Sequence, residues 1–201
     1  MRSALASDLS LKLEALRRTV GEMESALVAF SGGVDSTFVL RACRDALGAR
    51  AIALTAVSPS LAREELSEAR DLARGMGVEH LIVESHEVEN PAYRANPANR
   101  CFYCKTELYS ICVEKARDLA LRFVVDGANL DDLGDHRPGR DAARRAGIRS
   151  PLIEAGFSKA DIRAISRRWG LPTWNKPQLA CLSSRFPYGT EITVEKLNQV
   201  E

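Results

Sequence analysis

The sequence predicts an α/β fold, a doubly wound and mainly parallel sheet, and three observations support this. Short apolar runs alternate with longer segments of helical periodicity. The first apolar run is followed at once by Ser31-Gly32-Gly33 and then by a helical segment. A later apolar run ends at Asp126, and a second glycine follows it. We therefore expect at least four strands, with a ligand beyond their carboxyl ends.

Local patterns of side chains predict each helix, strand and loop along the chain. Residues 9–23 have apolar side chains every three or four positions, which is typical of an amphipathic helix. Ser158 stands three residues before Asp161 at capping-box spacing, which places a helix start there. Composition and periodicity predict strands over 26–30, 51–57, 80–83 and 123–126, and helices over 34–47, 61–76, 104–121 and 158–169. Loops are expected over 89–100 and 172–189, and the charged stretch 131–147 is expected to end in a helix.

The length of 201 residues suits one main fold with an appendage. We divide it into a nucleotide-binding domain, 1–170, and a segment, 171–201, that carries a cysteine and begins a C-terminal extension. The chain stops inside a stretch that resembles the start of a helix, so we expect the extension to be incomplete and the chain to be a fragment of a longer protein.

Charge and apolar content exclude several classes of protein. There are 28 basic and 27 acidic side chains, a balance that gives no general case for nucleic-acid binding. The sequence contains no apolar run of about 20 residues, so no membrane partner is expected. The N-terminus lacks the apolar core of a secretion signal, which predicts a cytoplasmic protein. Five cysteines then indicate reduced thiols, metal ligands or chemistry, and not a disulfide framework.

The hexapeptide Ser31-Gly32-Gly33-Val34-Asp35-Ser36 is the most informative motif. Its glycines allow the backbone to approach a ligand, and the following helix directs free N–H groups at an anion. Ser31 and Ser36 add hydroxyl donors, while Asp35 is placed to cap the helix or to hold Mg²⁺. The lysine of a Walker A loop is absent. A simple turn with an aspartate cap is the competing interpretation, and the position after the first strand favours phosphate binding.

This hexapeptide resembles the signature of the PP-loop ATP pyrophosphatases, the superfamily of GMP synthetase, NAD synthetase and the tRNA thiolases. The resemblance implies an adenine nucleotide alpha hydrolase-like fold, release of pyrophosphate from ATP, and an adenylated intermediate. A second motif runs from Asp126 to Asp132 and continues to Arg137-Pro138-Gly139. Side chains after Asp126 are expected over the nucleotide, with Asn129 at ATP and with Asp131, Asp132 and Arg137 at Mg²⁺ or substrate. The alternative is that these acidic residues simply form a solvent-exposed turn without a ligand.

The cysteines fall into two groups. Cys101 and Cys104 have the spacing of zinc and iron–sulfur ligands, and Cys181 lies in a second expected loop. Three thiolates suit a [4Fe-4S] cluster with one open iron, whereas zinc would need a fourth ligand. Cys43 and Cys112 lie within expected helices and are interpreted as small core residues.

Basic residues stand beside the loop cysteines: Arg100, Lys105 and Arg185. They are expected to lower the pKa of the thiols, although a solvated basic flank explains them equally well.

Together these motifs make nearly the whole chain similar to the LarE family of ATP-dependent sulfur transferases. Besides the two motifs above, the resemblance rests on residues 99–105 and on the segments Ala180-Cys181-Leu182-Ser183-Ser184-Arg185 and Pro187-Tyr188-Gly189. It implies adenylation of a pyridinium bis-carboxylate mononucleotide and replacement of oxygen by sulfur, on the route to the nickel-pincer nucleotide cofactor of lactate racemase. It also implies a homo-oligomer, and it leaves the sulfur donor open.

The resemblance further assigns catalytic roles to Cys181, Arg185 and Asp35. Some family members give up the sulfur of one cysteine, which corresponds to Cys181. Others have three cysteines and a cluster, and Cys101 and Cys104 favour that type. The family's arginine-bearing C-terminal segment is missing from this sequence.

Three alternatives remain. A tRNA thiolase would combine the same loop with three cysteines, but it calls for a basic face. An amide-forming synthetase of the NAD or GMP type would need no cysteines. A nucleotide-sensing module would bind AMP without releasing pyrophosphate.

Overall fold

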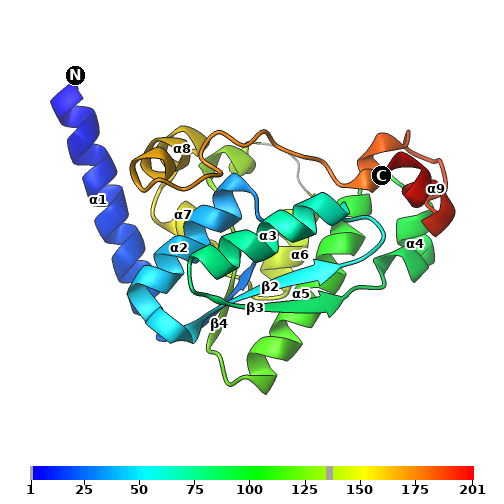
Figure 1. Cartoon of the computed structure of the whole chain (residues 1–201), viewed down its shortest axis with the longest axis horizontal. Helices are drawn as coiled ribbons and strands as arrows, with labels where there is room; N and C mark the ends of the chain where they lie inside the picture. Colours follow the sequence, from blue (N-terminus) through cyan, green and yellow to red (C-terminus); the bar gives the residue numbers. More distant parts are fainter. Residues whose placement is uncertain (1, 135–137) are drawn as a thin grey trace.

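The structure is a computed structural model that describes residues 2–134 and 138–201. Its centre is a parallel four-stranded sheet of order β3-β2-β1-β4 (Figure 1). The strands are β1 (Ala26–Ala29), β2 (Ala51–Val57), β3 (Glu79–Glu84) and β4 (Phe123–Val125). The chain moves outward from β1 to β3 and then returns to the other side of β1, so the strand order reverses between β1 and β4.

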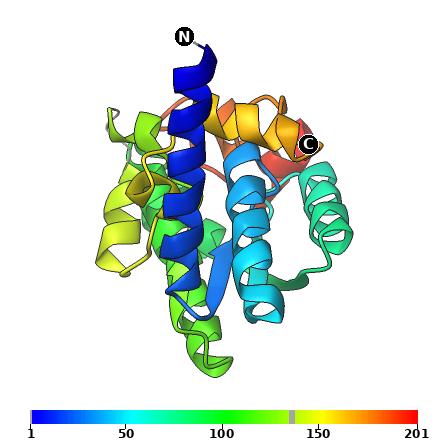
Figure 2. The same ribbon diagram turned by 90° about the vertical axis from the view of Figure 1, so that its left-hand side faces the viewer.

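Helices cover both faces of the sheet, which confirms the predicted doubly wound architecture. One face packs on α1 (Arg2–Gly21), α2 (Val34–Leu47) and α3 (Arg63–Gly75), together with α7 (Pro151–Glu154) and α8 (Lys159–Arg168). The other face packs on α5 (Arg100–Asp118), and α6 (Pro138–Arg145) lies against α5. Figure 2 shows α1 and α2 side by side on the first face. Alternate residues of β1 point to the two cores, Val28 to the first and Leu27 to the second.

A third, smaller core lies away from the sheet. It joins α4 (Pro91–Arg94) and the first turn of α5 to the segment that ends in α9 (Val194–Val200). Its buried members are Val88, Tyr93, Leu182, Ile192 and Leu197. Figure 1 shows α4 and α9 together at the opposite end of the molecule from α1. The segments that carry the loop cysteines therefore pack on each other in this layer.

The predicted strands and main helices agree with the structure, and the differences have local causes. The stretch expected as a loop contains α4, because Asn90 caps the backbone N–H of Ala92 and Pro91 occupies the first helical position. α5 begins at Arg100, which places Cys101 and Cys104 in its first turns. Cys43 and Cys112 are fully buried, as expected for core residues. In the described part of the chain no helix has both the length and the apolar character needed to cross a membrane.

The predicted cap of α8 is present and also ties this helix to α1. The backbone N–H of Ser158 donates to Asp161, the N–H of Asp161 donates to the Ser158 hydroxyl, and Lys12 Nζ lies 2.9 Å from Asp161 Oδ2. Partial burial tends to raise the pKa of Asp161, but hydrogen bonds from Lys12 and Ser158 outweigh it and lower this pKa. The stabilisation is therefore present above the pKa of an unfolded aspartate, about 4, and is lost as the pH falls below it.

We expect Asp161→Ala to lower the free energy of unfolding by about 1–2 kcal/mol at neutral pH, because both a cap and an ion pair are lost. Urea unfolding measures the change. Asp71→Ala is the control, since Asp71 forms only an exposed pair with Arg74. Equal stability losses in the two variants at pH 7 would contradict the prediction.

Candidate active site

The site lies where the strand order reverses, beyond the carboxyl ends of β1 and β4. The turn after β4 lies directly against the start of α2. A Cβ atom added to Gly127 would stand 2.8 Å from the backbone nitrogen of Ser36 and 2.9 Å from the carbonyl carbon of Asp35. Only glycine permits this approach, so Gly127 fixes the distance between the two motifs found in the sequence.

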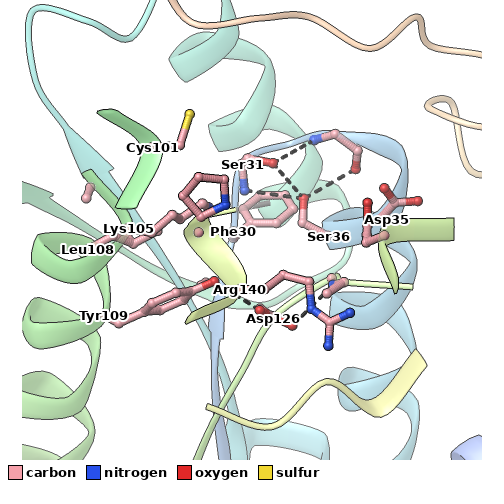
Figure 3. A pocket seen from close by; sticks show the side chains of 18 of the residues that line it. Phe30, Ser31, Asp35, Ser36, Cys101, Lys105, Leu108, Tyr109, Asp126 and Arg140 are labelled. Atoms are coloured by element: carbon pink, nitrogen blue, oxygen red, sulfur yellow. Dashed lines mark hydrogen bonds between the residues drawn. The ribbon is translucent and has the colours of Figure 1, made fainter. Parts of the chain in front are cut away.

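The loop after β1 is closed by its own serines (Figure 3). The Ser36 hydroxyl donates to the carbonyl of Gly33 at 3.3 Å and accepts from the backbone N–H of Ser31 at 3.3 Å. The Ser31 and Ser36 hydroxyls are 3.1 Å apart. Gly32 has a φ of +70°, and a Cβ atom added to it would lie 3.2 Å from Ala69 of α3. The loop thus presents hydroxyls and the N-terminus of α2 together, as binding of a phosphate group requires.

A lysine from another element completes this loop. Lys159, the first residue of α8, extends its ammonium to within 2.5 Å of Asp35 Oδ2. Burial raises the pKa of Asp35, and the Lys159 hydrogen bond partly offsets this shift. The other carboxylate oxygen, Oδ1, is buried without a hydrogen-bond partner among the described residues. Lys159 lies 124 positions after Asp35 in the chain. It nevertheless supplies a cation that the loop's own sequence lacks.

The loop opens into a cavity of about 580 Å³. Figure 3 shows Cys101, Lys105, Leu108 and Tyr109 of α5 along one wall, opposite Ser31, Asp35 and Ser36. The cavity floor is rigid, because buried Asp126 accepts hydrogen bonds from Tyr109 at 2.9 Å and from Ser150 at 2.8 Å. Burial, with the nearby Asp126 charge, raises the pKa of Tyr109, which therefore remains a hydrogen-bond donor.

Two cations, Lys105 and Arg140, also line the cavity. Arg140 reaches it from α6. An anionic compound bound beside Cys101 would therefore meet positive charge on two sides.

The second motif is present but its side chains are used mainly within the protein. Asn129 is buried and accepts the N–H of Asp131, while Asp132 accepts the N–H of Asn129, which forms a capping box for the short helix Leu130–Leu133. Asp131 accepts the backbone N–H of Lys159 at 2.7 Å and so holds the start of α8. Of these three residues, Asp132 lines the cavity. Arg137 lies outside the described residues.

The three loop cysteines are neighbours but are not equivalent. Cys101 lines the same cavity as the loop Ser31–Ser36, which we name the phosphate loop. Cys104 instead packs in the third core. The Cys181 sulfur lies 3.4 Å from the Ser184 hydroxyl. Arg185 donates to the carbonyl of Val200 in α9 and is not among the cavity-lining residues.

The expectation that basic neighbours lower the thiol pKa is wrong for Cys104. Burial raises the pKa of this thiol to about 12, and Lys105 opposes the shift without overcoming it. The charges of Cys181 and Cys101 also contribute to the increase, which shows that the three sulfurs are within electrostatic range of one another. At neutral pH Cys104 is therefore a thiol in this arrangement.

As folded here, the cysteines do not form a closed metal site. Across residues 2–134 and 138–201, no three His, Cys, Asp or Glu side chains are close enough together to hold a metal ion. Ligation by all three would require the segments of α5 and Cys181 to move closer together.

Sequence reasoning missed Lys159 and Arg140, which lie at or beside the site, and it assigned no role to Tyr188, which it noted only as part of a motif. Tyr188 lines the same cavity as Cys101, and 69% of its surface is exposed. Lys159 carried a usable signal, since it follows the Ser158 cap and so stands at a helix start. Arg140 had none, because only the packing of α6 on α5 brings it to the cavity.

Fold and site together define a nucleotide-binding α/β domain of the PP-loop type. Comparisons with known proteins agree. Residues 9–99 match the model of the NAD synthase family. The fold is similar to that of an NH3-dependent NAD synthetase from Campylobacter jejuni, with a TM-score of 0.65 and 17% identity over 82% of this chain and 74% of that one.

Two relatives are similar over almost the whole chain. An uncharacterized protein of Synechocystis sp. is 53% identical over 96% of this chain and 72% of its own length. The pyridinium-3,5-bisthiocarboxylic acid mononucleotide synthase of Lactiplantibacillus plantarum is 36% identical over 96% of this chain and 70% of its own length. The chain therefore belongs to the LarE family.

Gly127→Ala should disrupt the phosphate loop, because the added methyl group collides with the backbone of Asp35 and Ser36. We expect a loss of about 1–3 kcal/mol in stability and weaker ATP binding. Calorimetric titration with ATP and urea unfolding test both effects. Gly75→Ala serves as the control, since no other side chain or loop among the described residues lies within 4 Å of its added Cβ. ATP affinity equal to that of the wild type in Gly127→Ala would show that the contact is unimportant for binding.

Lys159→Met should weaken ATP binding by about tenfold to a hundredfold, the range for losing a hydrogen bond between charged groups. Lys115→Met is the matched control, because among the described residues Lys115 forms an ion pair only with Asp118, one turn further along α5. Fluorescence or calorimetric titration gives the two dissociation constants. If the Lys159 variant bound ATP as tightly as the Lys115 variant, the ammonium would serve Asp35 alone.

Proposed function

We propose that this protein is an ATP-dependent sulfur transferase that acts on a pyridinium bis-carboxylate mononucleotide, in the biosynthesis of the nickel-pincer nucleotide cofactor. The name of the Lactiplantibacillus relative and family membership support the substrate class. The proposal includes Mg²⁺, a homo-oligomer, and the division into a PP-loop domain, 1–170, and a cysteine-bearing segment, 171–201.

One observation carries the proposal: Cys101 and the phosphate loop line the same cavity. An amide-forming synthetase has no use for a thiol beside its nucleotide, whereas sulfur transfer needs the two together. The net charge of +1 gives little attraction for a polyanionic RNA.

The nucleotide half of the reaction follows from the loop. The hydroxyls of Ser31 and Ser36, the N-terminus of α2 and the ammonium of Lys159 would hold the β and γ phosphates. Asp35 and Asp132, which lies close enough to raise the pKa of Asp35, would share Mg²⁺. A substrate carboxylate oxygen then attacks the α phosphorus, the α–β bond breaks, and pyrophosphate leaves.

The sulfur half takes place at the α5 wall. Lys105 and Arg140 would hold the carboxylates of the substrate, with the adenylated carbonyl carbon facing Cys101. A sulfur nucleophile adds to this carbon and AMP departs, so that a thiocarboxylate is formed. Cys101, Cys104 and Cys181 would be the ligands of a [4Fe-4S] cluster, and the chemistry that such a group would supply is inorganic sulfide as the nucleophile.

The test is anaerobic purification followed by iron, sulfide and zinc analysis, with pyrophosphate release and thiocarboxylate formation measured in parallel. Variants are Cys101→Ala, Cys104→Ala and Cys181→Ala. Cys112→Ala is the control, since this thiol lies on the same helix but is fully buried in the core. We expect about four irons per chain, lost in each of the three variants and retained in the control.

Other results would revise the proposal in different ways. Metal-free active protein in which only Cys181 is essential would indicate that this cysteine gives up its own sulfur. Activity with ammonia that none of the cysteine variants affects would favour an amide-forming synthetase. Absence of pyrophosphate release with any acceptor would favour a nucleotide-sensing module.

A further inference from the structure

Tyr188 is an exposed aromatic residue on a well-defined turn. The backbone N–H of Thr190 donates to the carbonyl of Pro187 at 3.0 Å, and Gly189 has a φ of +82°, as a type II turn requires. Tyr188 therefore occupies the first of the two central positions. Among the large hydrophobic side chains of the described residues it has the highest exposed fraction, 69%.

Asn96 holds this turn in place through two hydrogen bonds. Its side-chain amide donates to the carbonyl of Pro187 at 2.9 Å, and its own carbonyl accepts the N–H of Gly189 at 2.9 Å. Asn96 is fully buried with a φ of +50°, a conformation that asparagine tolerates better than most residues. The side-chain oxygen of Asn96 accepts from the buried guanidinium of Arg100. The backbone under Tyr188 is thus fixed although its ring is exposed.

A rigid backbone under an exposed ring is suited to binding, because little further order must be imposed when a ligand arrives. Tyr188 and Cys101 line the same cavity, and the turn that carries Tyr188 is hydrogen-bonded to Asn96, which is close to Cys101 in the sequence. The cavity is also lined by apolar residues at and after the carboxyl ends of β1 and β2: Ala29, Phe30, Ala56 and Leu61. The strand ends and the C-terminal segment thus both contribute apolar contacts, which suits two rings, the adenine of ATP at the strand ends and a second ring at Tyr188.

We propose that Tyr188 stacks on the pyridinium ring of the acceptor and selects a cationic ring over a neutral one. This inference rests on the proposed function. The face of a tyrosine ring is electron-rich and attracts organic cations, while Lys105 and Arg140 attract the carboxylates at the edge of the same molecule. An acceptor with a positive ring and negative substituents therefore matches the charges that surround it.

The experiment compares two probes, 1-methylpyridinium-3,5-dicarboxylate and the neutral-ring pyridine-3,5-dicarboxylate, by calorimetric titration. The proteins are the wild type, Tyr188→Phe and Tyr188→Leu, with ATP affinity measured on each. We expect the wild type to prefer the pyridinium probe and Tyr188→Phe to keep that preference. Tyr188→Leu should bind the pyridinium probe about three- to thirtyfold more weakly, with unchanged affinity for ATP. Because Tyr188 is exposed, thermal melting should show that all three proteins are equally folded.

The outcomes separate this inference from the proposed function. If the wild type binds the pyridinium probe and Tyr188→Leu binds it equally well, the stacking role is overturned and the proposed function stands. A parallel loss of ATP affinity in Tyr188→Leu would assign the ring to adenine and overturn the inference in that way. Failure of the wild type to bind either dicarboxylate would overturn the proposed substrate class and the inference together.

Discussion

The site depends on the close approach of Gly127 to the first turn of α2. β1 and β4 are adjacent parallel strands, so the loops that follow them start side by side. The two loops form one site because the loop after β4 passes within van der Waals distance of Asp35 and Ser36. The absence of a side chain at Gly127 permits this. The hydroxyls of the phosphate loop, the Asp126–Tyr109 floor and the start of α8 are all positioned relative to this contact.

Asp131 extends the same arrangement to the third element of the site. By accepting the backbone N–H of Lys159, it joins the loop after β4 to the N-terminus of α8. α8 is itself fixed by its packing on α2, by the contact of Phe38 in α2 with Phe157 just before the α8 cap, and by its ion pair to α1. The charge of Lys159 is thus held by three separate elements, which explains how a residue far along the chain can replace a lysine within the loop.

The sequence was sufficient to predict the architecture because the signals were local. The apolar runs that became β1 and β2, the glycines after β1, and the Ser158–Asp161 cap each report on neighbouring residues. The tight turn between β1 and α2 was predictable for the same reason.

The remaining features depend on tertiary contacts that periodicity does not encode. The interpretation of Asn129 and Asp131 as ligands overlooked their capping bonds, which depend on how the chain turns after β4. The burial of Cys104 reversed the expected direction of its pKa shift, because desolvation outweighs a neighbouring lysine. Arg140 reaches the cavity only because α6 packs against α5.

The separation of the cores determines which parts of the protein can open independently. Cys104 and the segment around Cys181 are held by the small cluster of Val88, Tyr93, Leu182, Ile192 and Leu197, whereas the strands are held by two others. Regions stabilised by separate clusters can open at different free-energy costs. The segment around Cys181 can therefore open locally while the sheet, which is held by the other two clusters, stays folded.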